Sequence, residues 1–279
     1  MNMKTAFDFW INEQAIKPII TLCKDFDDSI GGGIRIGAIT ELVGGPGAGK
    51  TQFCLQICIN VQIPKDLCGL EGAAVFIETN CGFSIKRIKE IATATLKHCE
   101  FIYRTNEIDH DPNAFNVETM MNNIFCIFCN NHLELLATIQ NLKELLTQNP
   151  KIRLIVIDSF SYLFRSLDDA DVNSVQILYN ALAVLQKLAN SFNCAILITN
   201  ELTTCFTADN KPQLLPALGY SHSHRNNFQI TLARDVDDRK VIIANIDKTF
   251  VGEEKRVIFM ITEDGIRPIR HKRPHDPNE

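Results

Sequence analysis

The stretch AITELVGGPGAGKTQFCLQICINV, residues 38–61, joins two apolar segments through a glycine-rich turn. The turn fits the pattern G-x-x-x-x-G-K-[ST], and its flanks read as a strand before it and a helix after it. A strand, this turn and a helix in that order predict a phosphate-binding P-loop. The residues of the predicted loop are Gly44, Gly45, Pro46, Gly47, Ala48, Gly49, Lys50 and Thr51.

The residue types of this loop have a direct chemical meaning. Glycines allow consecutive backbone N–H groups to turn toward phosphate oxygens, and the following helix adds the positive end of its dipole. Lys50 is expected to reach the β- and γ-phosphates, and the Thr51 hydroxyl is expected to bind Mg²⁺. We therefore expect ATP and Mg²⁺ as ligands. The alternative is a glycine-rich turn without a ligand.

Strand-like and helix-like segments alternate on both sides of the loop. Short apolar runs at 36–44, 73–78, 123–129, 153–158 and 194–199 are separated by helical patterns at 50–61, 84–98, 132–147 and 172–191. This alternation predicts an α/β fold with a mostly parallel central sheet flanked by helices. After residue 226 the segments NFQITLAR, RKVIIANID and KRVIFMIT are separated by short polar turns. They predict C-terminal antiparallel strands that extend the sheet.

Composition limits the class of protein. The chain of 279 residues is 46% hydrophobic and 22% charged, which is ordinary for a globular protein with a full core. A net charge of −5 gives no overall positive field, so any contact with DNA must be local. The first residues, MNMKTAFDFWINEQ, lack the continuous apolar core of a secretory signal, and no apolar run approaches a membrane span. We expect a soluble, intracellular protein.

Two further predicted strands end in polar residues. The run RLIVID ends at Asp158, and a buried strand that ends in an acid after a P-loop is the Walker B pattern that holds Mg²⁺. The run AAVFIE ends at Glu78 and continues through Asn80. Chemistry is expected at both ends, because ligands of open α/β sheets bind outside the carboxyl ends of the strands. Thr51 and Asp158 are the predicted Mg²⁺ residues.

The order of these motifs resembles that of the RecA-like strand-exchange recombinases and their eukaryotic relatives. The similarity begins near Ile19 and covers IITLCKDFDDSIGGGIRIGAITELVGGPGAGKTQFCLQ, VQIP, FIETNCGFSIKR, LANSFNCAILITNELTT and LLPALG. Within the family the sequence is most similar to the C-type paralogue of the eukaryotic recombinase. The resemblance implies a RecA-like P-loop ATPase core over 19–265, a short N-terminal segment over 1–18 and a basic C-terminal tail over 266–279.

The sequence departs from the family pattern in ways that bear on catalysis. The helical N-terminal DNA-binding domain common in the eukaryotic members is expected to be missing. The family's strand-tip carboxylate, which positions the attacking water, aligns with Asn80, and an amide cannot accept a proton from water. The family's γ-phosphate-sensing glutamine aligns with Glu201, which has no amide donor. These changes imply that nucleotide binding is kept while hydrolysis is weak or absent.

Glu78 is the alternative base. Strand alternation places residues 78 and 80 on the same face, so Glu78 lies close to the position of the missing carboxylate. The family, however, keeps an acid at this position beside the base rather than in its place.

The resemblance also implies two DNA-facing loops. They correspond to 164–173 (FRSLDDADVN) and 203–219 (TTCFTADNKPQLLPALG). Aspartates outnumber Arg165 and Lys211 there, so phosphate neutralisation would be poor and we expect DNA binding to be shared with a partner. A surface or subunit-interface position for Arg165 is the alternative. The cluster HSHR, residues 222–225, is predicted as an exposed turn, with a nucleotide or DNA contact as the alternative.

The tail and the cysteines each allow two interpretations. Arg267, Arg270, Lys272 and Arg273 resemble the basic nuclear-targeting end of the C-type paralogue, with a solvated end as the alternative. We therefore expect a nuclear protein. Most of the ten cysteines lie in apolar surroundings and are expected to be small core residues. Cys126, Cys129 and His132 would form only half of a structural zinc site, so a metal there is the weaker alternative.

Together these features predict an ATP-binding recombinase paralogue. It would assist homologous recombination and DNA double-strand break repair, including meiotic recombination, within a complex of other paralogues or with the recombinase filament. The rival interpretation is a P-loop enzyme with real turnover, either a DNA-stimulated ATPase motor or a small-molecule kinase. A kinase should carry an arginine-rich lid, which we do not find. A scaffold that has lost nucleotide binding is a third interpretation.

Overall fold

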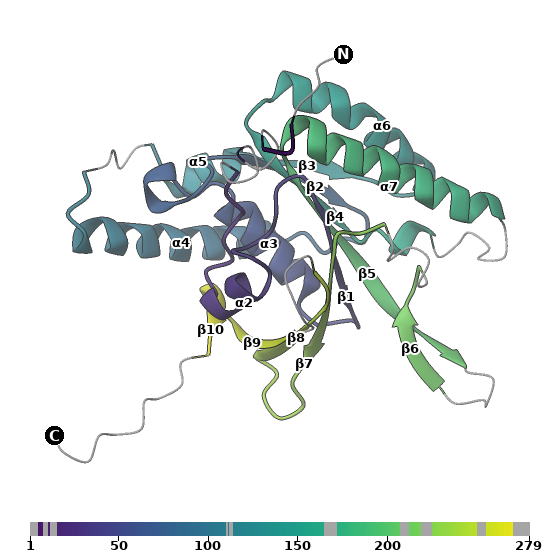
Figure 1. Cartoon of the computed structure of the whole chain (residues 1–279). Helices are drawn as coiled ribbons and strands as arrows, with labels where there is room; N and C mark the ends of the chain where they lie inside the picture. Colours follow the sequence, from purple (N-terminus) through teal and green to yellow (C-terminus); the bar gives the residue numbers. More distant parts are fainter. Residues whose placement is uncertain are drawn as a thin grey trace.

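The structure is a computed structural model, and it describes residues 5–7, 11, 16–109, 111, 114–164, 172–206, 212–218, 225–249 and 255–269. Its centre is one ten-stranded sheet with the order β10-β9-β8-β7-β1-β5-β4-β2-β3, and β6 pairs with β5 outside this path (Figure 1). The fold is mixed α/β, as the alternation of segments predicted.

The parallel part of the sheet brings the predicted site strands together. Its strands are β1 (Ile39–Gly44), β2 (Ala73–Glu78), β3 (Ile124–Phe128), β4 (Ile152–Asp158), β5 (Ala195–Phe206) and β7 (Phe228–Arg234). β1 pairs with β5 and β7, β4 pairs with β5 and β2, and β2 pairs with β3, all in parallel. The carboxyl ends of β1, β5, β4 and β2 therefore meet along one edge of the sheet.

The C-terminal strands extend the sheet in antiparallel fashion, which confirms the prediction. They are β8 (Val241–Lys248), β9 (Lys255–Thr262) and β10 (Gly265–Pro268), and they follow β7 in that order. β10 takes Arg267 and Pro268 into the sheet, and the neighbouring Ile266 is fully buried.

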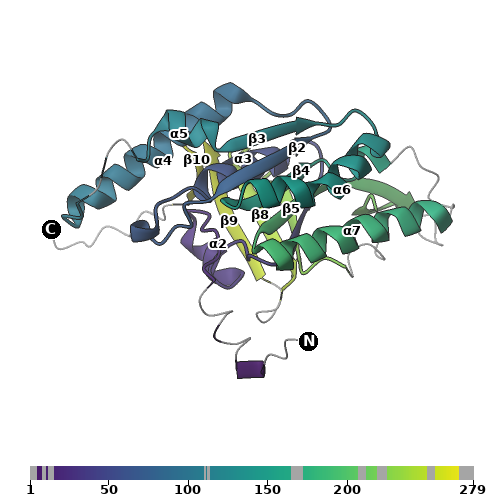
Figure 2. The same ribbon diagram turned by 90° about the horizontal axis from the view of Figure 1, so that it is seen from above.

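Helices cover both faces of the sheet. The helices α2 (Lys24–Ser29), α3 (Lys50–Asn60), α4 (Ile85–Thr105) and α5 (Val117–Asn122) pack in one apolar core, and α6 (His132–Gln148) and α7 (Val172–Phe192) pack in another. Figure 2 shows α6 and α7 lying over β4 and β5. This two-sided burial explains why the central strands read as continuous apolar runs.

Strand alternation decides which residues face the P-loop helix α3. Ala74 and Phe76 of β2 and Leu154 and Val156 of β4 belong to the core that contains α3. The odd-numbered residues of the same strands belong to the core of α6 and α7. Since alternate side chains share a face, the even-numbered residues that end these strands, at 78 and 158, lie on the α3 side.

Some elements differ from the sequence expectation. The short helices α2 and α5 were not predicted. The predicted loop at 203–219 is instead an antiparallel pair of β5 with β6 (Pro212–Pro216), with Thr203 opposite Leu215 and Thr204 opposite Leu214. The β-branched threonines favour continuing the strand beyond the body of the sheet. Figure 1 shows this pair projecting away from the sheet.

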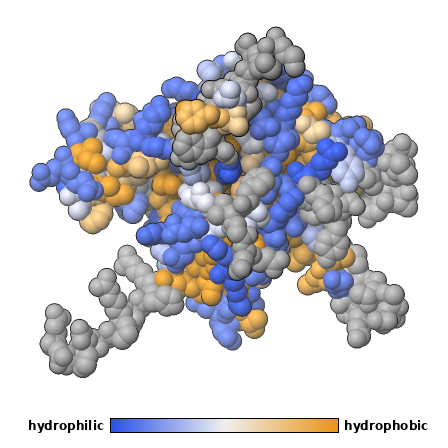
Figure 3. Space-filling model, in the orientation of Figure 1, coloured by the Kyte–Doolittle hydropathy of each residue, from blue (hydrophilic) through white to orange (hydrophobic). Residues whose placement is uncertain are grey.

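The surface carries apolar residues in small separate groups among hydrophilic ones on the face shown in Figure 3. Along the parts of the chain that the structure describes, no helix has the length and apolarity needed to cross a lipid bilayer.

Candidate nucleotide-binding site

The predicted P-loop lies between β1 and α3, at the carboxyl edge of the sheet. Gly47 and Gly49 have φ angles of 76° and 98°, in the left-handed region that favours glycine. A Cβ at Gly44 would lie 2.6 Å from the Leu232 carbonyl oxygen, so this glycine allows the loop to press against β7. Gly45 faces open space instead. The loop therefore favours glycine at positions 44, 47 and 49, and it leads directly into the start of α3.

Lys50, the first residue of α3, folds back over this turn. Its side chain is buried, and Nζ donates to the carbonyl oxygens of Gly44 at 2.7 Å and Gly45 at 3.1 Å. The ammonium group is thus held inside the loop that would receive a phosphate. An anion there would give the same ammonium a stronger, charge-assisted partner.

Asp158, the last residue of β4, is buried on the α3 side of the sheet. Its Oδ1 accepts a hydrogen bond from Thr199 Oγ1 at 2.6 Å, while its Oδ2 is buried without a partner. Burial raises the pKa of this carboxyl, while hydroxyls of Thr199 and Thr51 and the charge of Lys50 act in the opposite direction. A buried, bare carboxylate oxygen near Thr51 is the donor type that Mg²⁺ takes in proteins. The residues present therefore fit a divalent cation.

The strand-tip turn after β2 is fixed by Glu78. Glu78 is 2% exposed, and its Oε1 accepts the backbone N–H of Asn80 at 2.8 Å and of Gly82 at 3.1 Å. The side chain of Asn80 is exposed. A Cβ at Gly82 would lie 3.2 Å from Asn80 Oδ1 and 3.6 Å from Thr51 Oγ1, so this turn approaches the P-loop. Asn80 is thus near the candidate phosphate site, and Glu78 fixes the turn through its two hydrogen bonds to the backbone.

Glu201 lies on β5, next to the tips of β1 and β4. Its backbone N–H donates to Ser161 Oγ at 3.1 Å, and its carbonyl oxygen accepts from the Ala217 N–H at 2.7 Å. Its side chain is partly exposed. The structure therefore brings Lys50, Thr51, Asp158, Asn80 and Glu201 to one edge of the sheet.

Sequence reasoning missed the threonines that organise this edge. Thr199 donates to Asp158, and Thr79 exchanges hydrogen bonds with the backbone of Ser159 at 2.8 and 2.9 Å. Both hydroxyls are buried and join neighbouring strands. Their only sequence signal is a threonine at a strand end, which becomes informative once the strand order is known.

The remaining predicted site residues either lie outside the described residues or are not part of the P-loop edge. Arg165, Lys211, Arg270, Lys272, Arg273 and residues 222–224 lie outside the described residues. Arg225 lies with its guanidinium 5.0 Å from the Tyr179 ring centre, as an exposed stacked arginine. Arg267 belongs to β10, where burial lowers the pKa of its guanidinium.

The two cysteines of the predicted pair, Cys126 and Cys129, differ in exposure. Cys126 is exposed on β3, whereas Cys129 is buried and shares a hydrogen bond with Thr138 Oγ1 at 3.4 Å. Within the described ranges, no group of three or more His, Cys, Asp or Glu side chains could hold a metal ion.

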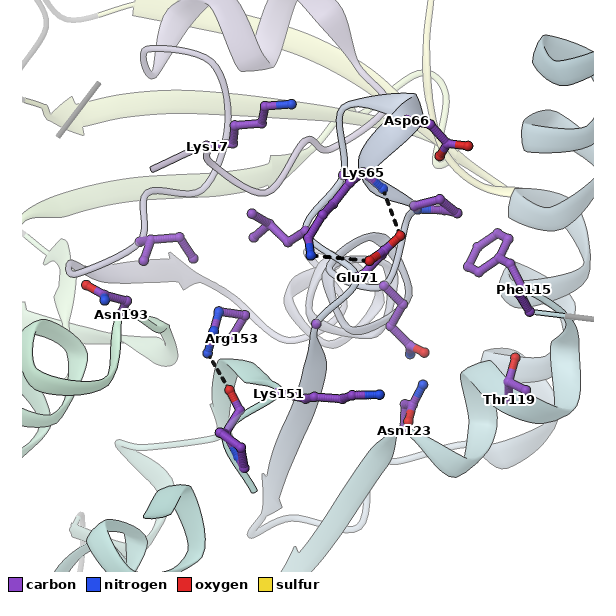
Figure 4. A pocket seen from close by; sticks show the side chains of 18 of the residues that line it. Lys17, Lys65, Asp66, Glu71, Phe115, Thr119, Asn123, Lys151, Arg153 and Asn193 are labelled. Atoms are coloured by element: carbon purple, nitrogen blue, oxygen red, sulfur yellow. Dashed lines mark hydrogen bonds and ion pairs between the residues drawn. The ribbon is translucent and has the colours of Figure 1, made fainter. Parts of the chain in front are cut away.

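A hollow of about 910 Å³ lies at the opposite edge of the sheet, beside the amino ends of the parallel strands (Figure 4). Its charged residues already have protein partners in several places. Lys65 Nζ lies 3.4 Å from Glu71 Oε2, and Arg153 Nη1 donates to the Pro150 carbonyl at 2.8 Å. Ligands of open α/β sheets bind at the carboxyl ends of the strands. The P-loop edge, rather than this hollow, is therefore the candidate nucleotide site.

Comparison with known proteins adds independent evidence. The sequence model of the Rad51 family matches residues 12–269. DNA repair protein RAD51 homolog 3 of Cricetulus griseus is 33% identical over 267 residues, which cover 94% of this chain and 72% of that protein. The protein of the same name from Dictyostelium discoideum is 31% identical over 265 residues, covering 94% of this chain and 68% of that protein. DNA repair and recombination protein RadA of Aeropyrum pernix is 32% identical over 270 residues, covering 96% and 78%.

Proposed function

Because the chain belongs to the Rad51 family, with its RecA-like fold, we propose that it is an ATP-binding recombinase paralogue that assists homologous recombination and DNA double-strand break repair. A role in meiotic recombination is part of this proposal. The observation that carries it is the P-loop edge: a glycine-rich turn around Lys50, with the unpartnered oxygen of Asp158 on the same side of the sheet as Thr51. Gly44 to Thr51 would hold the phosphates, and Thr51 and Asp158 would hold Mg²⁺.

In this proposal ATP is held and split slowly or not at all. Asn80 lies at the strand tip where the family keeps its water-activating carboxylate, and its amide cannot act as a base. Glu78 is a poor substitute, since one of its oxygens is already committed to two backbone N–H groups. Glu201 adds negative charge at the sensor position. Bound ATP would then mainly stabilise assembly with partner subunits rather than be hydrolysed rapidly.

The free edge of the sheet supports assembly with partners. β3 is the terminal strand of the sheet, and in the described residues it pairs only with β2. Phe128 is 64% exposed, and Leu133, just beyond it, is 66% exposed. An exposed apolar edge strand is a template for pairing with another chain. We propose this edge as the docking place for another recombinase paralogue or a recombinase filament subunit.

DNA binding in this proposal is shared with the partner, and the protein acts in the nucleus. The net charge of −5 leaves no overall positive field to neutralise phosphates. The relatives that are named DNA repair proteins favour a nuclear role.

The experiment that tests this function combines a binding and a turnover measurement. ATP with Mg²⁺ should raise the melting temperature of the wild-type protein, because a ligand that binds the folded state stabilises it. Lys50→Ala should abolish this shift and repair activity. Lys65→Ala, which removes an exposed lysine remote from the P-loop, is the matched control and should keep both.

ATP hydrolysis with and without single-stranded DNA separates the proposal from its rivals. We expect turnover well below about 1 per second, the low end of typical enzymes. Faster, DNA-stimulated turnover would favour an ATPase motor. A wild-type protein that ATP does not stabilise would favour a scaffold without nucleotide binding.

A further inference from the structure

Two buried carboxylate oxygens without hydrogen-bond partners lie at the ends of adjacent strands. They are Oε2 of Glu78, at the end of β2, and Oδ2 of Asp158, at the end of β4. Glu78 is 2% exposed and Asp158 is 1% exposed, so water does not solvate either carboxylate freely. A buried anionic oxygen that lacks a partner is unfavourable unless a cation or a proton compensates it.

The backbone places these two side chains next to each other. Glu78 and Asp158 are register partners in the parallel pair of β2 with β4, which sets their strands about 4.8 Å apart. Both lie on the α3 face, since Phe76 and Val156, two residues earlier on each strand, pack in the core of α3.

Each carboxylate keeps its other oxygen occupied, which fixes the free one. Glu78 Oε1 accepts the N–H groups of Asn80 and Gly82, and Asp158 Oδ1 accepts the Thr199 hydroxyl. The backbone donors fix Glu78 through the turn itself, so the position of its free oxygen does not depend on a mobile side chain. The arrangement therefore presents two fixed, bare anionic oxygens on the side of the sheet that Thr51 occupies.

We infer that Glu78 contributes the second anionic oxygen of the Mg²⁺ site, facing the cation together with Asp158 and Thr51. This inference rests on the proposed function, in which that edge binds ATP with Mg²⁺. Mg²⁺ in nucleotide sites is held by one or two carboxylates together with substrate phosphates, which this set matches. Glu78 is then a metal-side residue rather than a replacement for the missing base. Because its negative charge lies near the phosphates, ATP binding should also depend more strongly on Mg²⁺.

The test compares wild type with Glu78→Gln. The glutamine oxygen still accepts from Asn80 and Gly82, and its NH₂ group becomes a donor for the bare Asp158 oxygen. The ligand-free variant should therefore fold and melt at least as high as wild type. With ATP present, the Mg²⁺ concentration that gives half of the melting-temperature rise should increase about tenfold, equivalent to about 1.4 kcal/mol. Binding of ATP in EDTA should stay the same or tighten, since one negative charge near the phosphates is gone.

The control is Glu41→Gln. Glu41 is another buried carboxylate of the sheet; it lies on β1 and accepts from Asn200, Asn226 and Gln229. Its replacement should leave the Mg²⁺ midpoint unchanged, whatever it does to stability. An unchanged midpoint in Glu78→Gln would overturn the inference and leave the proposed function standing.

Failure of the proposed function has a different signature. If ATP with Mg²⁺ does not stabilise wild type, nucleotide binding is refuted, and Mn²⁺ alone still tests the cation site. Mn²⁺ binding without nucleotide is read from the loss of the free-ion electron paramagnetic resonance signal. Weaker Mn²⁺ binding by Glu78→Gln than by wild type supports the inference, and equal binding overturns it.

Discussion

Asn80 illustrates how one residue changes the chemistry expected at the P-loop edge of the sheet. Its side chain is exposed beside the P-loop, and its backbone N–H is held by Glu78. Asn80→Glu would return a carboxylate to the strand tip. We expect ATP turnover to rise by less than the roughly 100-fold that a well-placed general base contributes, because Glu201 remains at the sensor position.

Steady-state phosphate release measures this effect. Asn80→Gln, which has the length of glutamate without a basic oxygen, should stay at the wild-type rate. A jump to fast turnover in Asn80→Glu alone would contradict the role that we assign to Glu201.

At the residue scale, local motifs and long-range contacts differ in how far sequence predicts them. The strand, turn and helix around Lys50 could be predicted because the glycine pattern and both flanks lie within one stretch of chain. The hydrogen bond from Thr199 to Asp158 joins residues 41 positions apart. This bond forms because β4 and β5 are neighbours in the sheet, and local sequence patterns do not reveal which strands are neighbours.

At the scale of elements, apolar runs and helical periodicity predicted the central strands and the long helices. The helix α2, with the six residues KDFDDS, has no strong apolar periodicity to mark it. The β5–β6 pair was expected to be a loop because the family resemblance implied a DNA-facing loop over these residues. Its strand pairing comes from the contact between two segments, which composition alone does not reveal.

The free edge of β3 allows an element-scale prediction about partners. Cys129 donates its N–H to Glu78, and Asn123 accepts from Ala74, so alternate residues of β3 face β2. The N–H of Cys126 then points to the open edge. Cys126→Pro removes this outward donor while keeping the ladder to β2, and proline is tolerated at such edge positions.

The expected result is loss of partner subunits from the purified native complex. Cys126→Val, which keeps the N–H and favours a strand, is the matched control and should retain them. Equal recovery of partners with both variants would show that β3 is not the docking edge.

At the scale of the whole molecule, the strand order explains why the site forms. Residues near positions 44, 80, 158 and 200 are distant in sequence, and the order β1-β5-β4-β2 brings their strand ends to one edge. The sequence could predict an α/β fold and antiparallel C-terminal strands, because these follow from local patterns. The order of the parallel strands depends on how the crossovers pack, so only the family resemblance could suggest it.

The stability of the whole fold should depend on pH through Asp27. This residue of α2 is 9% exposed, and both carboxylate oxygens accept the Thr21 N–H, at 3.0 and 3.1 Å. Burial raises the pKa of Asp27 from 3.8 to about 7, against the opposing effect of the Thr21 hydrogen bonds. Between these two values the folded protein binds more protons than the unfolded chain, so the free energy of unfolding falls as the pH rises.

Urea unfolding at pH 5 and pH 8 measures this dependence. Each pH unit between 5 and the folded pKa corresponds to about 1.4 kcal/mol, so wild type should lose about 2.6 kcal/mol of unfolding free energy across this range from Asp27. Asp27→Asn cannot titrate, and its side-chain oxygen can still accept the Thr21 N–H, so its unfolding free energy should change less. Asp25→Asn, at an exposed position of the same helix, should behave as wild type. If Asp27→Asn shows the same pH dependence as wild type, the buried carboxyl of Asp27 is not its source.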